Sequence, residues 1–116
     1  MHFTKLVPEI YYKEISAGLK TFIDCLEFTM GHDDLKSQNP FCVVVKGDLK
    51  IMLFANKEHA ENNHPLLRLE TTDIESIHKK IKSKYPELLH PNLPNVTMRP
   101  WGAKEFAILD GQTCVG

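Results

Sequence analysis

The segment from Pro100 to Gly111 holds the residues of this chain that are best suited to binding chemistry. It contains the only tryptophan, Trp101, between a proline and a glycine in an expected surface turn. Tryptophan is usually well buried, so an indole in a turn is a candidate platform for a planar ligand. The alternative is that Trp101 caps the edge of the core. The residues alone favour neither interpretation.

Other side chains capable of chemistry show no catalytic spacing. His59 and His64 lie in a polar stretch at a separation that does not place them on one helical face. His78 falls on an apolar helical stripe, where a partly buried core histidine is expected rather than a metal ligand. The chain has no Gly-rich phosphate loop, no Gly-x-Ser-x-Gly elbow, and no cysteine with an evident histidine partner. We therefore assign no catalytic residue.

Length and composition predict one globular domain. The chain has 116 residues, of which 42% are hydrophobic and 25% charged, and this is enough for a sizeable core. Its formal net charge of −1 argues against nucleic acid or an acidic membrane as a partner. No apolar run approaches the ~20 residues of a membrane span, and we expect no secretory signal. Three cysteines without a CxxC pair indicate free buried thiols in the cytoplasm.

The elements that would position these residues begin with a strand over 5–12, in which Pro8 favours a sheet edge. A helix should follow, with Ser16 as its N-cap and Gly31 at its stop. Its buried stripe has helical spacing and consists of Leu19, Phe22, Ile23 and Leu26. Residues 32–40 read as a loop with room for a short strand.

A hairpin is expected next, because a continuous apolar run and a second β-rich run flank a Lys-Gly-Asp turn. Its strands are Phe41–Val45 and Leu49–Ala55. The polar stretch 56–64 that follows is expected to be a loop.

The same order of elements then recurs. A strand is expected over 66–71, and a helix capped by Thr72 or Asp73 should follow and end at Pro86. Short strands are expected at 96–99, 103–109 and 112–115. Each half therefore reads as a strand, a helix and further strands, which indicates a weak duplication of a β-α-β-β-β unit. A plain α+β sandwich without duplication is the alternative.

Three segments resemble the glyoxalase/bleomycin-resistance/extradiol-dioxygenase (vicinal oxygen chelate) superfamily, and within it the bleomycin-resistance-like proteins that bind no metal. Glu14–Phe28 is similar to the first-helix pattern of the family, and Lys46–Phe54 is similar to the hairpin of its first half. Pro100–Gly111 resembles its Trp-Gly segment, strand and Asp-Gly turn, and it is the most specific of the three.

The resemblance implies an α+β fold in which two β-α-β-β-β modules form curled mixed sheets around a cavity. Residues 1–116 would form a single domain, with module one at about 5–55 and module two at about 66–116. Small members of the family often dimerise, so the resemblance implies a homodimer with its cavities at the interface.

The metalloenzymes of this superfamily place His, Gln or Glu at four strand positions. Aligned through the neighbouring helices and turns, these positions fall near Val7, Met52, Leu66 and Val115. Aliphatic side chains cannot bind a hard or borderline cation, and methionine is a soft, weak ligand. We therefore expect no metal and no other cofactor. Whether the protein is an enzyme stays open at this point, with binding favoured over turnover.

The alternation of side chains along strands predicts which residues line the cavity. If Val7, Met52 and Leu66 point inward, the residues two or four positions away along their strands also do, whereas the intervening aliphatic residues pack under the helices. With the turn tryptophan and one further carboxylate, the predicted ligand-binding residues are Trp101, Phe54, Tyr11, Glu9, Arg68, Glu70 and Glu105. The mix of aromatic and charged groups suits an amphipathic organic ligand. The alternative for the charges is cross-strand pairing of Arg68 or Lys50 with a glutamate.

These residues and the resemblance together favour a metal-independent protein that sequesters an aromatic or cationic antibiotic or metabolite in a cleft at a dimer interface. By resemblance, the ligand could be a bleomycin-type antibiotic and the role antibiotic resistance. Because the net charge is only −1, a small organic ligand in general is favoured over bleomycin itself. The alternatives are a glyoxalase- or dioxygenase-like lyase or isomerase of the same superfamily, and a module that recruits another protein.

Overall fold

The computed structural model describes residues 1–111 and 114–115, and it divides into two compact units, Met1–Asn63 and His64–Gly116. Each unit is a module of the predicted kind, in which a strand and a helix are followed by further strands. The fold is therefore mixed α+β, as the sequence predicted. That both modules make one domain stays a prediction.

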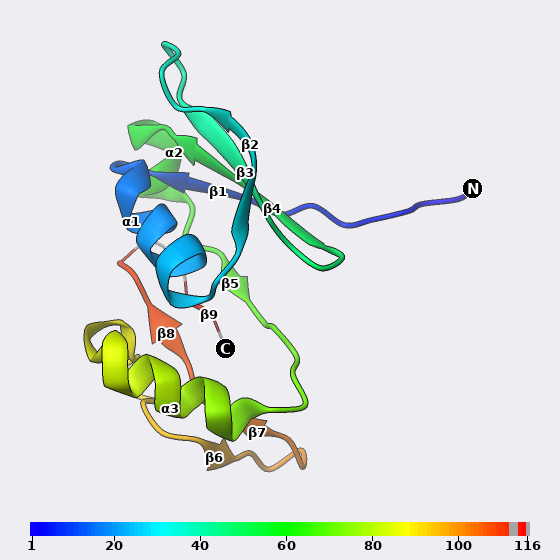
Figure 1. Ribbon diagram of the computed structural model, residues 1–116, viewed down its shortest axis with the longest axis vertical. Helices are drawn as coiled ribbons and strands as arrows, with labels where there is room; N and C mark the ends of the chain where they lie inside the picture. The colour runs from blue at the N-terminus through cyan, green and yellow to red at the C-terminus, as the bar shows by residue number, and fades with distance from the viewer. Residues whose placement is uncertain (112–113, 116) are drawn as a thin grey trace. The chain divides into compact units, whose positions relative to one another are not determined.

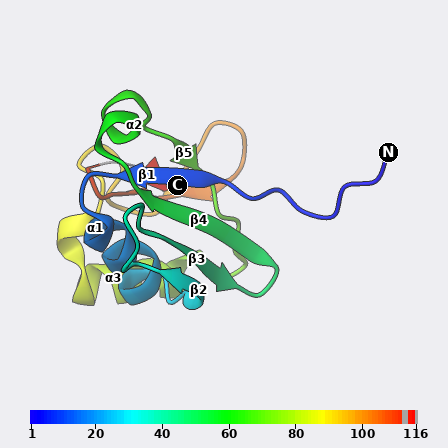
Figure 2. The same cartoon turned by 90° about the horizontal axis from the view of Figure 1, so that it is seen from above.

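The first unit is a four-stranded sheet with a helix on one face (Figures 1 and 2). Its sheet order is β1-β4-β3-β2, in which β1 is parallel to β4 and the other pairs are antiparallel. The strands are β1 (Glu9–Tyr12), β2 (Thr29–Asp34), β3 (Phe41–Lys46) and β4 (Leu49–Ala55). β1 begins directly after Pro8 and lies at the sheet edge, as the missing N–H of proline requires. Residues 1–8 run out from it as an arm (Figure 1).

The helix of the first unit differs from the prediction in its register. It starts as α1 (Ile15–Leu19) with Glu14 as N-cap rather than Ser16, and continues as a π-helix, η1 (Lys20–Cys25). The wider π-helical turns rotate the buried stripe, which consists of Gly18, Thr21, Phe22 and Cys25 and shares only Phe22 with the predicted set.

The predicted helix stop at Gly31 is wrong. The helix ends instead before Glu27, which adopts a left-handed conformation with φ of 62°. Gly31 lies in β2 at an irregularity of the β2–β3 register, where a Cβ atom would approach Val45 Cγ1 to 3.2 Å. The glycine therefore serves close strand packing.

The predicted hairpin is confirmed, because β3 and β4 pair from Phe41 with Phe54 to Lys46 with Leu49. Gly47 in its turn has φ of 58°, which glycine adopts without strain. The expected loop over 56–64 is wrong, since it contains helix α2 (Lys57–Asn62). Asn56 Oδ1 caps that helix by accepting a 3.0 Å hydrogen bond from the His59 N–H, and this signal was missed in a polar stretch.

The second unit has shorter strands and the same pairing scheme. β5 (Leu66–Leu67) is parallel to β9 (Cys114–Val115), which is antiparallel to β8 (Ile108–Leu109). A separate pair joins β6 (Thr97–Met98) to β7 (Lys104–Glu105). The parallel and antiparallel partners of β9 repeat those of β4, and this supports an internal duplication.

Two strands predicted in the second unit are shorter in the structure than expected. The expected strand 103–109 is split into β7 and β8, because residues 89–93 bond to its middle: the Ala107 N–H donates to Leu93 O, and Ala107 O accepts from the His90 N–H. The expected strand 66–71 ends at Leu67. For the expected strand 112–115, residues 112 and 113 lie outside the described part.

Helix α3 (Ile74–Lys84) matches its prediction, with Asp73 as N-cap, and a short 3₁₀ turn, η2 (Pro86–Leu88), follows. Its apolar stripe ends on the fully buried Ile81. His78 is half-buried on the same face, bonded to Pro94 O at 2.8 Å and packed edge-on against Phe106. It is therefore placed as the expected core histidine. Among the described helices, none is both long and apolar enough to cross a membrane.

Candidate ligand site

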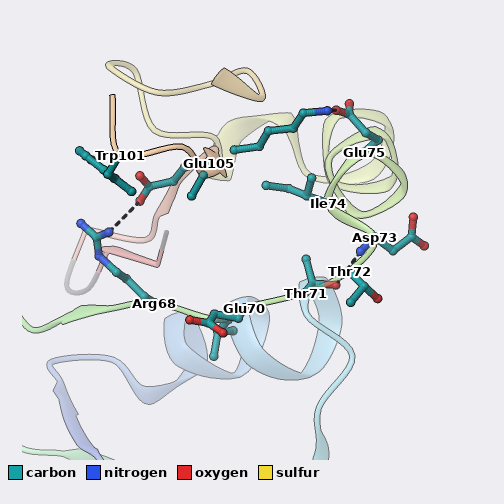
Figure 3. Close-up of a pocket in the computed structure, with 12 residues that line it drawn as sticks. Arg68, Glu70, Thr71, Thr72, Asp73, Ile74, Glu75, Trp101 and Glu105 are labelled. Carbon is teal, nitrogen blue, oxygen red and sulfur yellow. Dashed lines mark hydrogen bonds and ion pairs between the residues drawn. The ribbon is translucent and has the colours of Figure 1, made fainter. Parts of the chain in front are cut away.

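The second unit contains an open cleft of about 660 Å³ that carries four of the seven predicted ligand-binding residues (Figure 3). One wall is the chain from Arg68 to Glu75, which connects β5 to the start of α3. The other wall is the hairpin formed by β6 and β7. Arg68, Glu70, Trp101 and Glu105 all line this cleft.

Trp101 lies at the tip of the hairpin because of the local turn chemistry. Arg99 O accepts a 2.9 Å hydrogen bond from the Gly102 N–H, which closes a turn with Pro100 in its second position. Gly102, with φ of 89°, leads the chain back toward β7. The indole remains 58% exposed, so Trp101 does not cap the core edge.

The charges of the cleft are partly paired. Glu105 Oε1 lies 3.9 Å from Arg68 Nη1, and its Oε2 lies 3.5 Å from Arg99 Nε. At the other end, Lys104 Nζ lies 3.5 Å from Glu75 Oε1. The alternative that Arg68 pairs with a nearby glutamate is thus realised. Arg99, Lys104 and Glu75 were not predicted, because their approach depends on the hairpin and on the start of α3.

The cleft nevertheless keeps an excess of negative charge. Four carboxylates line it, from Glu70, Asp73, Glu75 and Glu105, against the lining cations Arg68 and Lys104 and the further cation Arg99 beside Glu105. Within the described residues, Glu70 and Asp73 form no ion pair. A cleft with an exposed indole and surplus carboxylate suits a ligand that is both aromatic and cationic.

The other three predicted residues, Glu9, Tyr11 and Phe54, lie on one face of the sheet in the first unit. The register pairs Glu9 with Met52 and Tyr11 with Phe54, so their side chains share a face, as alternation predicted. The opposite face carries the buried residues Ile10, Tyr12, Cys42, Val44, Ile51 and Leu53.

This face carries a row of rings that sequence reasoning did not find. Tyr11 stacks on Phe54 at a centroid distance of 5.2 Å, and Phe54 stacks on Phe41 at 5.8 Å. His59 extends the row beyond Tyr11 at 4.9 Å, and His32 extends it beyond Phe41 at 5.5 Å. We call these five residues the aromatic row. The register brings together rings that are far apart along the chain.

Two titratable groups of the first unit have a raised pKa. For Tyr11 the causes are burial, followed by the negative charge of Glu9 and the 3.3 Å hydrogen bond that the phenol donates to it. For the fully buried Cys42, burial and then the charge of Asp33 raise the pKa of the thiol. Cys42 therefore stays protonated near neutral pH, which is unsuited to a nucleophile.

The positions that align with the metal ligands of the superfamily's enzymes differ in their burial and in their place along the strands. Met52 is half-buried, Leu66 is 62% exposed, and Val7 precedes β1, so Glu9 rather than Val7 pairs with Met52. The side chain of Val115 lies outside the described part. Across residues 1–111 and 114–115, no three His, Cys, Asp or Glu side chains gather closely enough to hold a metal ion. That none is bound stays a prediction, and nothing in the described site favours the enzymatic alternative.

No protein-family model and no curated protein sequence matches the chain significantly. Solved structures do match over nearly the whole chain. A bleomycin-binding protein from Streptomyces verticillus, in complex with copper(II)-bleomycin, is 20% identical with a TM-score of 0.72, covering 99% of this chain and 94% of that one. A member of the glyoxalase/bleomycin resistance protein/dioxygenase superfamily from Sphaerobacter thermophilus is 17% identical with a TM-score of 0.73, covering 97% and 94%.

A lactoylglutathione lyase from Agrobacterium tumefaciens also matches, at 14% identity and a TM-score of 0.66, covering 97% of this chain and 92% of that one. At such identities, the likeness shows the fold. The fold of this protein is that of the glyoxalase/bleomycin-resistance protein/dioxygenase superfamily, and the resemblance seen in the sequence is confirmed.

Proposed function

We propose that the protein is a metal-independent binder of small molecules, of the bleomycin-resistance type. It sequesters an aromatic or cationic antibiotic or metabolite in a cleft at the interface of a homodimer. The observation that carries this proposal is the cleft of the second unit, which combines a half-exposed indole with surplus carboxylate. Two matching solved structures are bleomycin-binding proteins complexed with bleomycin or its copper(II) form, and they support a ligand of this kind.

Within the proposed site, each group has a distinct role. Trp101 stacks on a planar part of the ligand, and Glu70 and Glu105 attract its positive charge. Glu9, Tyr11 and Phe54 are proposed as a separate recognition surface of the first unit, on one face of its sheet. Arg68 pairs with Glu105 and modulates the charge that the ligand meets.

A fluorescence titration with metal-free bleomycin tests this function, because Trp101 is the only tryptophan. Saturable quenching with one site per chain is the expected result. Glu70→Gln should weaken binding, because Glu70 is a carboxylate of the cleft that forms no ion pair within the described residues. Glu58→Gln, an exposed carboxylate change on α2, is the matched control and should leave the affinity unchanged. A flat response to bleomycin and to other planar cationic antibiotics would contradict the proposal.

A further inference from the structure

Two guanidinium groups of the second unit approach the indole of Trp101. The Cζ atom of Arg99 lies 5.0 Å from the ring centroid and that of Arg68 lies 5.8 Å from it, both within the range of a cation–π interaction. The same two arginines flank the carboxylate of Glu105. One aromatic ring and one carboxylate thus attract the same pair of planar cations.

The two arginines are held very differently. Arg99 follows β6, its backbone N–H donates to Ala103 O at 2.8 Å, and its side chain is only 34% exposed. Arg68 lies beyond the end of β5, outside any strand, and its side chain is 60% exposed. Its contact with Glu105 spans 3.9 Å, which is long for an ion pair, and an exposed pair of this kind contributes little to stability. Arg68 is therefore the guanidinium that can leave at low cost.

We propose that Arg68 occupies the place which a planar cation of the ligand, a guanidinium or amidinium group, takes when it binds. The ligand cation replaces the guanidinium of Arg68 beside Trp101 and next to Glu105, while Arg99 stays in position. Arg68 is thus a specificity-determining residue that competes with the ligand from within the chain. This inference rests on the proposed function, because it assumes that the cleft binds a ligand.

The side chain of Arg68 and the ligand cation that would replace it have the same chemistry. A guanidinium is planar, can stack on an indole and can bond a carboxylate through two N–H groups, and an amidinium shares these properties. A competing group inside the chain weakens ligand binding, because the ligand must first break the contacts of that group. For Arg68 these contacts are one exposed ion pair and one cation–π contact, and their free energy is subtracted from that of binding. Removing Arg68 should therefore tighten the binding of cations roughly three- to tenfold.

The test measures the affinity of benzamidine, an aromatic amidinium, by quenching of Trp101 in the wild-type protein, Arg68→Gln and Lys104→Gln. Lys104 lines the same cleft but pairs with Glu75, so Lys104→Gln removes one positive charge without touching Glu105. Benzamide, the neutral analogue, is titrated in parallel. We expect Arg68→Gln to tighten benzamidine roughly three- to tenfold, Lys104→Gln to do so by less than about twofold, and benzamide to respond little.

Two results would overturn the proposal: benzamidine affinity that does not rise in Arg68→Gln, or an equal rise in Lys104→Gln, which would reduce the effect to general electrostatics. Metal-free bleomycin separates this failure from that of the proposed function. If bleomycin binds the wild type and Arg68→Gln equally well, only the role of Arg68 is lost. If neither bleomycin nor benzamidine quenches Trp101 in any variant, sequestration in this cleft is refuted together with the exchange.

Discussion

The two units place their aromatic side chains in opposite settings. In the first unit, Tyr11, Phe54 and Phe41 stand on adjacent strands and stack on one another with interplanar angles of 24° and 21°. In the second unit, Trp101 stands alone at a hairpin tip, and two guanidinium groups lie over its ring. The rings of the first unit thus stack on other rings, whereas the indole of Trp101 contacts charged groups, of which Arg68 is the one that we propose a ligand displaces.

This difference follows from the lengths of the strands. β3 and β4 pair along their whole lengths, so rings on one face are kept in register at the spacing of the strands. As far as the structure describes the second unit, its strands contain two residues each, and their connections form the cleft walls instead. A duplicated module can therefore provide a firmly built sheet in one copy and an adaptable cleft in the other.

The largest effect is expected in the core of the first sheet. Leu53 is fully buried between its strand partners Ile10 and Cys42, so Leu53→Ala should lower the free energy of unfolding by about 2–5 kcal/mol. Urea denaturation followed by circular dichroism measures this. Leu49→Ala, on the same strand and 47% exposed in the wild type, is the control and should change stability by no more than about 0.5 kcal/mol. Equal effects of the two would mean that this sheet is not the firm element.

A second change tests the packing of α1 on the sheet. A Cβ atom on Gly18 would lie 2.5 Å from Cε2 of the buried Tyr12 ring, so Gly18→Ala should cost about 1–3 kcal/mol. This loss would appear although alanine is the better helix former by about 1 kcal/mol. Thermal unfolding measures it, with the exposed neighbour Ser16→Ala as control. A stabilised Gly18→Ala would show that Tyr12 can move aside.

Phe54 is the central ring of the aromatic row, and its removal tests whether stacking stabilises the first sheet. Phe54→Leu deletes the stacking on both Tyr11 and Phe41, and should reduce the free energy of unfolding by about 1–2 kcal/mol. Phe54→Tyr keeps the ring and should retain most of the stability. If Phe54→Leu has no effect on urea unfolding, the row does not stabilise the sheet, and the two units would not differ in how firmly they hold their rings.

Trp101→Ala should show the converse behaviour. Because the indole is exposed, stability should change by no more than about 0.5 kcal/mol. The affinity for metal-free bleomycin should fall by about 0.5–1.5 kcal/mol, through loss of the stacking surface. Calorimetry is the appropriate method, since this variant has no tryptophan to report, and Trp101→Phe should recover part of the affinity. An unchanged affinity would remove Trp101 from the site.

The smallest effect concerns the titration of Tyr11, whose pKa is raised above 10. A raised pKa in the folded state gives a stabilising contribution that is complete below the unfolded value near 10, and is lost as the pH rises through the folded value. Glu9→Gln should lower the pKa of Tyr11 without restoring the ordinary value, because burial is the larger cause.

Absorbance of tyrosinate during an alkaline titration measures this, and Tyr11→Phe identifies which phenol is responsible. A pKa of Tyr11 that does not move in Glu9→Gln would show that the carboxylate does not act on the phenol.

Much of the fold could be predicted because it depends on local patterns. The turn at Gly47, the alternation along β4 and the helical spacing from Ile74 to Ile81 each leave a periodic signal in the sequence. The π-helical turns of η1 leave no comparable signal, since their apolar spacing resembles that of an α-helix. The split of β7 from β8 was also missed, because it arises from hydrogen bonds to residues 89–93.

The site shows the same division. The surface turn that holds Trp101 and the shared face of Glu9, Tyr11 and Phe54 could be predicted, because turn chemistry and strand alternation act over a few residues. The approach of Arg68 and Arg99 to one carboxylate, Glu105, and the assembly of five rings into the aromatic row are visible only in the folded chain. Such contacts join residues that are distant in the chain, and they depend on strand registers and side-chain directions that no local pattern specifies.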